Sequence, residues 1–324
     1  MKKFIKGCLI AALVFVILGI CILAGAVAAG GMEQVAELVR DGSLSIHYSP
    51  NDWDDDFWEE TAEDDIWEEA VEGMEEPEVD STELLQQLGQ EEKLSRTVLA
   101  QEPERIRKLE LSLLGGAVCI KPSQDNTISI AYDDQYALRC KKDGETLRIE
   151  EATERHHIGS YNKRVIYLYI PQNQYFEQVE CKLGGGVMEI QKLTAQSAEF
   201  KLGAGMLTVK NLGCVKAEAK IGAGSMYLEN AEVEEGEFKI GAGELEYQGS
   251  IGKKLETVCD LGSAVFELDG QETDFDYEIG VAAGEISVGS HSYSGLNEKT
   301  KVDNKAGRRM ELECSMGSIE VSFE

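Results

Sequence analysis

The sequence has few of the residues on which chemical sites are usually built. Its histidines, at positions 47, 156, 157 and 291, lack the spacing of metal ligands, and its eight cysteines form no C-x-x-C pair. No zinc motif or dithiol redox motif is therefore present. The glycine-rich phrases are not followed by Lys-Ser or Lys-Thr, which excludes a phosphate-binding loop, and they lack the regular aspartate of calcium-binding repeats. We expect no metal, no cofactor and no catalytic residue.

Positive charge is also scarce, because 31 Lys and Arg stand against 60 Asp and Glu, for a formal net charge of −29. A chain this acidic repels phosphate backbones, so we expect no nucleic-acid partner and favour cationic ones. The segment 51–80 alone contains sixteen Asp and Glu and no Lys or Arg. The acidic character is therefore concentrated in one stretch.

The same acidic segment contains all three tryptophans, Trp53, Trp58 and Trp67. Segments of high charge and low hydrophobicity normally stay disordered. However, Trp53 and Phe57 have the i, i+4 spacing of one helix face. Two interpretations stay open: a self-repelling spacer, or an amphipathic helix that folds back over the basic residues found between positions 139 and 164.

Charge is absent between Gly7 and Met32, a run of 26 residues. Such a run can cross a hydrocarbon core of about 30 Å, and the lysines before it predict a cytoplasmic N-terminus and an extracytoplasmic remainder. A cleavable signal peptide is the alternative, although the run exceeds the usual signal core of about 7–15 residues. We expect residues 1–32 to be the cytoplasmic tip and anchor, 33–104 the juxtamembrane and acidic linker, and 105–324 the folded domain.

The phrases LGAGMLTV, IGAGSMYL and IGAGELEY begin 19 residues apart, at positions 202, 221 and 240. Aligned on the last glycine, apolar residues stand five and three positions before it and two and four positions after it. This alternation predicts two strands with one buried face, and the glycine marks a corner between them. The corner column then reads Gly116, Gly186, Gly205, Gly224, Gly243, Ala264, Gly284 and Gly317.

One pair of strands cannot bury its own apolar face, so the units must stack. The fold class predicted is all-β, a β-solenoid of coils of roughly 19–21 residues with neighbours about 4.8 Å apart. The alignment puts Cys181 and Cys259 in one column but four coils apart, too far for a disulfide. We therefore expect the thiols to act as small apolar side chains. The segment 290–309 is predicted to be a projecting loop or an added hairpin.

The outward positions show no comparable pattern. Four glutamates share the column three residues after the corner, and paired acids on one face would suggest a carbohydrate-active enzyme. The same column contains threonine, tyrosine and serine, so a solvated face is the simpler interpretation. The glutamates are Glu189, Glu246, Glu267 and Glu320.

The order of several phrases resembles a known family. LLGGAVCIKP, TISIAYD, GETLRIEE, VIYLYIPQ and LGGGVMEI precede the three repeats above, and together they are similar to the bacterial toastrack domains, described as candidate adhesins of otherwise unknown function. The resemblance covers residues 105–324. It implies an exported or membrane-anchored β-solenoid of a Gram-positive bacterium, and it implies no catalytic residues.

These observations together predict a non-enzymatic envelope protein with a single membrane span and a binding or sensing domain outside the cell. The partners expected are cationic peptides, a cell-wall polymer or a membrane protein. Two alternatives stay open: a carbohydrate-active enzyme on a solenoid, and a structural protein that assembles through its terminal coils.

Overall fold

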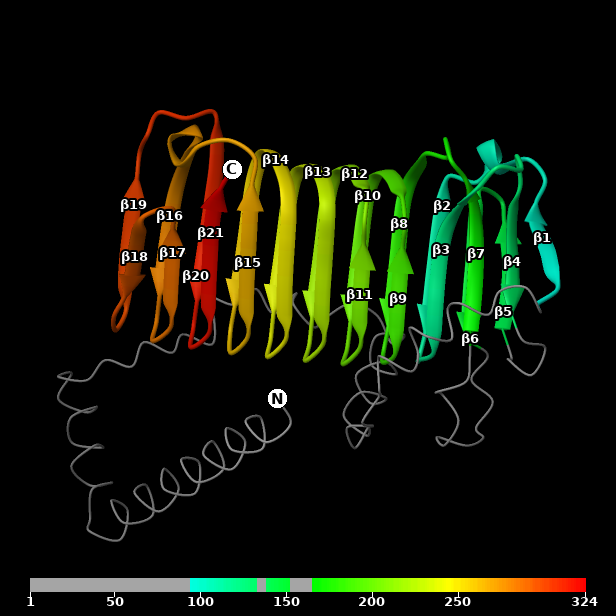
Figure 1. Ribbon diagram of the computed structural model, residues 1–324, viewed down its shortest axis with the longest axis horizontal. Coiled ribbons are helices and arrows are strands. Elements are labelled where there is room, and N and C mark those ends of the chain that lie inside the picture. Colours follow the sequence, from blue (N-terminus) through cyan, green and yellow to red (C-terminus); the bar gives the residue numbers. More distant parts are fainter. Residues whose placement is uncertain (1–93, 133–137, 152–164) are drawn as a thin grey trace, which may run out of the picture. The chain divides into compact units, whose positions relative to one another are not determined.

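The computed structural model describes residues 94–132, 138–151 and 165–324 (Figure 1). The expected membrane anchor and the acidic segment 51–80 lie outside these residues. Within the described ranges, no helix is long and apolar enough to span a membrane. Apart from the 3-10 turns η3 (Pro103–Arg105) and η5 (Glu272–Asp274), the regular structure there is β-strand, which confirms the all-β prediction.

The strands form two facing layers, to which each coil contributes one strand before its corner glycine and one after it (Figure 1). We call these the pre-glycine and post-glycine layers. In spatial order the pre-glycine layer contains β5 (Leu138–Asp143), β6 (Thr146–Glu151), β2 (Lys108–Leu113), β8 (Phe176–Leu183), β10 (Leu193–Leu202), β12 (Leu212–Ile221), the second halves of β13 (Ser225–Ile240) and β14 (Glu244–Cys259), β20 (Arg308–Cys314), β16 (Phe275–Val281) and β19 (Glu298–Val302).

The post-glycine layer is built in the same way. It uses the first halves of β13 and β14, and these two strands join the layers into one 21-stranded sheet. Its spatial order is β1 (Arg96–Ala100), β4 (Ile128–Tyr132), β7 (Val165–Pro171), β3 (Ala117–Ser123), β9 (Val187–Ile190), β11 (Met206–Val209), β13, β14, β15 (Ser263–Leu268), β21 (Ser318–Phe323), β17 (Glu285–Val288) and β18 (His291–Ser294).

The coils do not stack in chain order at either end. The last coil, β20–β21, lies between β14–β15 and β16–β17 and pairs in parallel with both. Strand β18 runs antiparallel to β17 and forms a hairpin with it, and β19 runs antiparallel to β16. The segment 290–309 therefore adds a hairpin, as one of the two predictions had it, and its two strands cap the stack instead of forming a projecting loop. At the other end, β2–β3 lies between β6–β7 and β8–β9, and β4 and β5 run antiparallel to β7 and β6.

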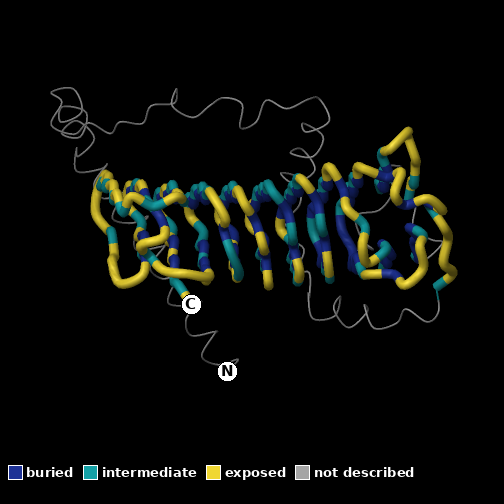
Figure 2. The backbone as a smooth tube through the Cα atoms, turned by 90° about the horizontal axis from the view of Figure 1, so that it is seen from above, coloured by how far each residue is buried: buried dark blue, intermediate teal, exposed yellow. Residues whose placement is uncertain are grey.

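Apolar side chains from both layers meet between them and form the core. In Figure 2 buried residues recur along the stacked coils. Phe238, Tyr247 and Phe266 make an aromatic group in which each ring centroid lies 5.8 Å from the other two. Tyr247 is accommodated because its hydroxyl donates to the carbonyl of Ser250 at 2.8 Å, and burial raises its pKa. Burying one such aromatic side chain contributes about 2–3 kcal/mol.

The corner glycines lie against the backbone of the neighbouring coil. A Cβ atom on Gly224 would overlap the carbonyl oxygen of Gly205, and one on Gly243 would overlap that of Gly224. The column includes Gly262 and not Ala264, since Ala264 pairs with Leu245, two residues past the corner. The sequence alignment was wrong at this coil because strand periodicity is two, so a shift of two residues leaves the apolar pattern unchanged.

The corrected column also changes the positions of the cysteines. Cys259 pairs with Cys314 of β20, whereas Cys181 pairs with Leu111 and Phe200 in a different column. None of the six cysteines among the described residues is in a disulfide, and burial raises the pKa of Cys181 to about 12 and that of Cys259 to about 11. Buried, protonated thiols act here as small apolar side chains.

The first prediction concerns the corner column. Gly224→Ala is expected to destabilise the domain by about 3 kcal/mol, because the added methyl group displaces the backbone of the next coil. Gly213→Ala in β12 is the matched control, since its Cβ would meet only a methyl group of Thr194 at 3.9 Å. It should be neutral or slightly stabilising. Chemical denaturation of both variants measures the difference, and equal midpoints would contradict the assignment of the column.

The second prediction concerns a polar group in the core. Thr257 pairs with Phe238 and Leu312, and among the described residues its buried Oγ1 has no hydrogen-bond partner. A buried hydroxyl without a partner costs about 1–3 kcal/mol, so Thr257→Val is expected to stabilise the domain by about 1 kcal/mol. Thr208→Val, on the outer face of β11, should give a smaller change. Lower stability of Thr257→Val would show that the hydroxyl has a partner.

Candidate functional site

A column of glutamates runs along the outer face of the pre-glycine layer. One stands six residues before each corner glycine, and the strand register places each directly beside the next. We call this set the glutamate column. In spatial order its members are Glu110, Glu180, Glu199, Glu218, Glu237, Glu256, Glu311 and Glu278.

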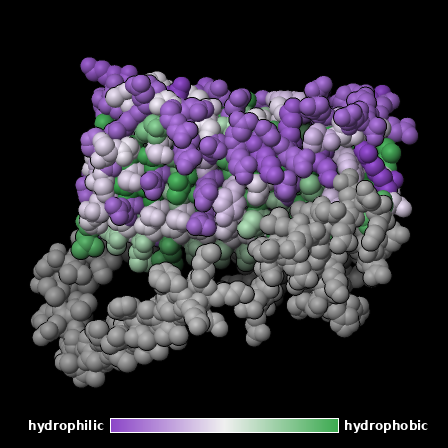
Figure 3. All heavy atoms as spheres, viewed as in Figure 1, coloured by the Kyte–Doolittle hydropathy of each residue, from purple (hydrophilic) through white to green (hydrophobic). Residues whose placement is uncertain are grey.

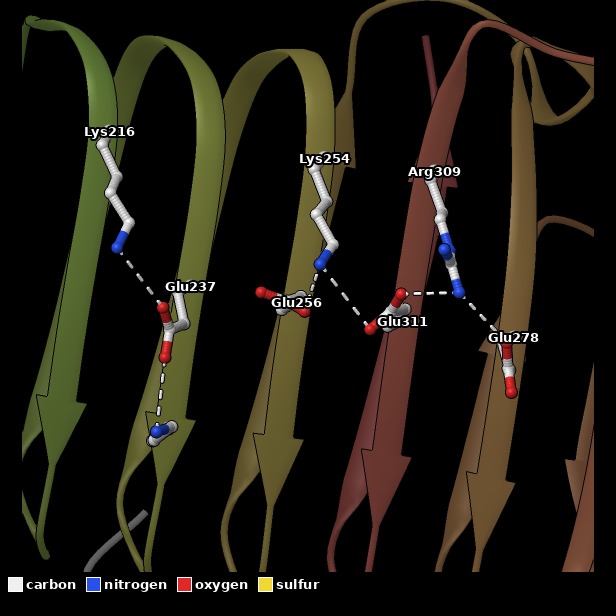
Figure 4. A network of polar contacts seen from close by, with 8 residues as sticks. Lys216, Glu237, Lys254, Glu256, Glu278, Arg309 and Glu311 are labelled. Atoms are coloured by element: carbon white, nitrogen blue, oxygen red, sulfur yellow. Dashed lines mark hydrogen bonds and ion pairs between the residues drawn. The ribbon is translucent and has the colours of Figure 1, made fainter. Parts of the chain in front are cut away.

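Like charges on directly opposed residues destabilise a sheet, so the column needs cations beside it. These lie two residues to either side along the strands. Lys201 Nζ lies 3.2 Å from Glu199 and 3.8 Å from Glu180, and Glu237 contacts Lys239 at 3.3 Å and Lys216 at 3.7 Å (Figure 4). On one side the lysines form a continuous row, Lys182, Lys201, Lys220 and Lys239. On the other side the row is mixed: Lys108, Lys216, Lys254 and Arg309 share it with Gln178, Ser197, Glu235 and Asp276.

The ion pairs continue across the coils that stack out of order. Lys254 contacts Glu256 and also Glu311, the latter at 3.8 Å, and Arg309 lies 2.7 Å from Glu311 and 3.2 Å from Glu278 (Figure 4). Burial and a hydrogen bond with the Glu256 carboxyl raise the pKa of Glu311. Burial acts likewise on Glu256, but hydrogen bonds from Lys254 and Glu311 outweigh it and lower its pKa. These neighbouring carboxyls therefore titrate as a pair.

The glutamate column is not among the site residues predicted from the sequence. The pattern is present as a repeated Glu-x-Lys before the corner, in ECKLG, EFKLG, EAKIG and EFKIG. The apolar positions, on which the coils align, do not distinguish it. The last three glutamates in spatial order are also harder to recognise, since Val258, Glu313 and Gly280 stand where the earlier coils have lysine.

The glutamates proposed from the sequence lie on the other layer. Glu189, Glu246 and Glu320 do share the outward column three residues after the corner, but Val265 takes that position in β15, and Glu267 lies two residues further along. Thr208 and Tyr227 separate Glu189 from Glu246, and Val265 separates Glu246 from Glu320. The paired acids expected for glycoside chemistry are therefore not formed in this column.

The hollows found on the described surface are small. One of about 60 Å³ lies between β16 and β19 beside Glu278 and Arg309, and another of about 10 Å³ lies beside Pro171. Ligand pockets usually measure about 300–1,000 Å³. Over the described ranges no cluster of His, Cys, Asp and Glu could hold a metal ion. Hydrophilic side chains instead cover much of the face seen in Figure 3.

The interaction segment predicted from the sequence, with Trp53, Phe57, Trp58 and Trp67, lies outside the described residues. Part of the basic region that it was expected to cover is described. Arg139, Lys141 and Lys142 lie on the edge strand β5, and Arg148 of β6 pairs with Glu110 and with Glu150.

The fold and this surface define a class of protein, a two-layered β-solenoid with a charged, periodic outer face. The sequence profile of the toastrack family (DUF4097) matches residues 106–323, and the chain belongs to that family. This assignment confirms the family resemblance seen in the sequence.

Solved structures with a similar chain trace have names that refer to adhesion or lipid binding. A candidate adhesin from Bacteroides fragilis is 14% identical, with 71% of this chain and 97% of that chain covered and a TM-score of 0.42. A candidate cell adhesion protein from Clostridium sporogenes is 11% identical, with 72% and 100% covered and a TM-score of 0.30. A candidate lipid-binding protein from Parabacteroides distasonis is 10% identical, with 71% and 96% covered and a TM-score of 0.34. No curated protein matches the sequence.

The third prediction tests the ion pairs. Lys254→Met is expected to lower the melting temperature at pH 7 by about 2–4 °C, roughly 1 kcal/mol, because Glu256 and Glu311 lose the cation between them. Without it the pKa of Glu311 in the folded protein, which is already raised, rises further. Stability is then lost as the pH rises above about 4.3, the pKa of an unfolded glutamate, so the deficit should shrink at pH 5.

The matched control is Lys253→Met, since Lys253 Nζ lies 3.2 Å from Glu234 and both side chains are about half exposed. It should change the melting temperature little at either pH. A deficit in Lys254→Met of the same size at pH 5 and pH 7 would contradict the coupling of the two carboxyls.

Proposed function

We propose that this protein is a non-enzymatic binding scaffold of the cell envelope, anchored by one membrane span and with its toastrack domain outside the cell. The anchor is supported by the uncharged run from Gly7 to Met32 and by the lysines that precede it. The observation that carries the binding role is the glutamate column. It presents carboxylates at a fixed spacing of about 4.8 Å along the stack.

The partner proposed has repeated cationic groups, either a cationic peptide or a cell-wall polymer that bears amino groups. Side chains of the column are between a fifth and a half exposed, so they are accessible while held in place by lysine. A partner with several cations binds such a row more tightly than a partner with one, because every contact after the first is intramolecular. The net charge of −29 favours its approach.

Two features favour a scaffold over the alternatives. Catalysis on a polymer needs acids within a cleft, and the hollow beside Glu278 and Arg309, at about 60 Å³, is much smaller than a usual ligand pocket. Assembly through the terminal coils needs open sheet edges. The edge strands β5 and β19 are short and charged, with Lys141 and Lys142 on one and Lys299 and Lys301 on the other, which opposes pairing with another chain.

The fourth prediction tests the binding surface on the full chain in detergent. Its variant carries Glu199→Gln, Glu218→Gln and Glu237→Gln, and a cationic antimicrobial peptide, teichoic acid and peptidoglycan are the probes. Saturable binding of at least one probe should weaken about tenfold, or about 1.4 kcal/mol. The matched control, Glu189→Gln, Glu246→Gln and Glu320→Gln, removes the same charge from the other layer.

Equal losses in the two triple variants would show that only net charge matters, and no saturable binding by the parent chain would refute the proposal. A further chain lacking residues 51–80 separates the solenoid from the acidic segment. Binding that is lost with the deletion but kept in the triple variant would assign recognition to the acidic segment instead.

A further inference from the structure

Two buried cysteines lie side by side where the coils stack out of chain order. The register pairs Cys259 of β14 directly with Cys314 of β20, and their side chains are 0% and 2% exposed. In the strand pairings of the described residues, no other cysteine stands opposite a cysteine. Cys181, for example, lies between Leu111 and Phe200. The pair therefore differs from the other thiols of the domain.

The pair occupies a core column that aliphatic side chains fill in the neighbouring coils. This column stands three residues before the corner glycine. In spatial order it contains Leu183, Leu202, Ile221, Ile240, Cys259, Cys314 and Val281. A branched aliphatic side chain buries more apolar area than a thiol does and so stabilises such a position more. Packing alone therefore does not explain two adjacent cysteines in this column.

The geometry of the pair suits a covalent bond. Neighbouring strands lie about 4.8 Å apart, within the range of about 4.4–6.8 Å that a disulfide needs between its Cα atoms. The Cys259 sulfur leans toward the coil of Cys314, since a Cβ atom on Gly317 would lie 2.9 Å from it. The Cys314 sulfur leans toward Gly284, and the two thiols are in hydrogen-bond contact. A change of the Cys314 rotamer is the movement that a bond requires.

The surroundings of the sulfurs determine when they can react. Burial raises the pKa of Cys259 to about 11 and also raises that of Cys314. Hydrogen bonds from the backbone amides of Ser318 and Gly262 to the Cys259 sulfur act in the opposite direction. The attacking species is the thiolate, so burial makes the pair slow to react in the closed stack. We expect reaction chiefly while β20–β21 is being inserted.

The junction between β14 and β20 lacks one of the two cationic rows that hold other coils together. Between earlier coils the residue before the cysteine column is a lysine, and Lys201 bridges Glu180 and Glu199 in this way. At the junction, Val258 and Glu313 take that position. The strands that meet there are also separated in the chain by β15 to β19. A cross-link would therefore act where the non-covalent contacts are fewest.

We propose that Cys259 and Cys314 form a disulfide that fixes the last coil in the stack. The oxidant is another disulfide, either a low-molecular-weight one or that of an oxidoreductase. One thiolate attacks it and forms a mixed disulfide, and the second thiolate then displaces the remaining half. Two electrons pass from the cysteines to the oxidant, whose halves leave as two thiols with the two protons that the cysteines lose.

The bond closes a loop that contains β15 to β19 and restricts the unfolded chain. It also fixes the order in which Glu256, Glu311 and Glu278 follow one another in the glutamate column. The proposal rests on the pair itself and is independent of the binding role proposed above. A domain outside the cell would keep the bond oxidised.

The fifth prediction follows the bond in the full chain in detergent. The reduced, unfolded chain is refolded with oxidised and reduced glutathione, the remaining thiols are alkylated, and tryptic peptides are analysed without reduction. Peptides 255–299 and 310–324 contain one cysteine each. Their linked form should exceed any other cysteine pairing at least about tenfold. The oxidised chain should melt about 10 °C above the chain kept reduced, because the bond closes a long loop.

Cys314→Ala should abolish both the linked peptide and the difference in melting temperature between the oxidised and reduced forms. The matched control, Cys181→Ala, makes the same change at a cysteine without a cysteine beside it and should keep both. If Cys314→Ala does not fold, Cys314→Val takes its place, since Val281 fills this position in the next coil.

Three results would overturn the proposal. One is glutathione attached to either cysteine of the parent chain without the linked peptide. Another is a linked peptide no more abundant than other pairings. The third is a bond that leaves the melting temperature unchanged or lowers it. None of these results depends on whether the glutamate column binds a cationic partner, so the two proposals fail separately.

Discussion

The close contact between each corner glycine and the backbone of the next coil determines the geometry of the domain. The amide of Ser225 donates to the carbonyl of Gly205 at 2.9 Å, and that of Glu244 to Gly224 at 2.9 Å. A side chain at the corner would separate the coils and break these bonds. Because neighbouring coils are set against each other in this way, the positions on either side of the corner are in register, on the outer face as well as in the core. Further from the corner the register can shift, as it does between Leu228 and Ala231 of β13.

In-register stacking has an electrostatic cost that the sequence offsets. A parallel stack places identical positions side by side, so a glutamate in every coil faces another glutamate on each side. Lysines displaced by two residues lie diagonally between them, as Lys201 does between Glu180 and Glu199. Where lysine is missing, at Glu256 and Glu311, the two carboxyls depend on Lys254 and Arg309 from the opposite side.

The repeat itself could be predicted from the sequence, because a strand period of two and a corner glycine leave a clear pattern. The position of Gly262 could not be settled by that pattern, since a shift to Ala264 keeps the same side chains inward. The order of the coils could not be predicted either. Every coil offers the same apolar faces and the same free edges, so β20–β21 could pair with any of them on local grounds. The glutamates of the column can be found in the sequence, four of them in a repeated Glu-x-Lys. Which of them lie side by side depends on which coils are neighbours.

The position of β20–β21 separates the order of synthesis from the order of assembly. A ribosome produces β14–β15 first, then β16–β17 with its cap, and only then the pair that lies between them. Neither neighbour has its final partner until β20–β21 has been made, and the amide of Glu324 bonds to the carbonyl of Leu268. This end of the stack therefore closes only after residues 308–323 have been synthesised, and a chain that ends before Arg308 leaves a gap inside the stack.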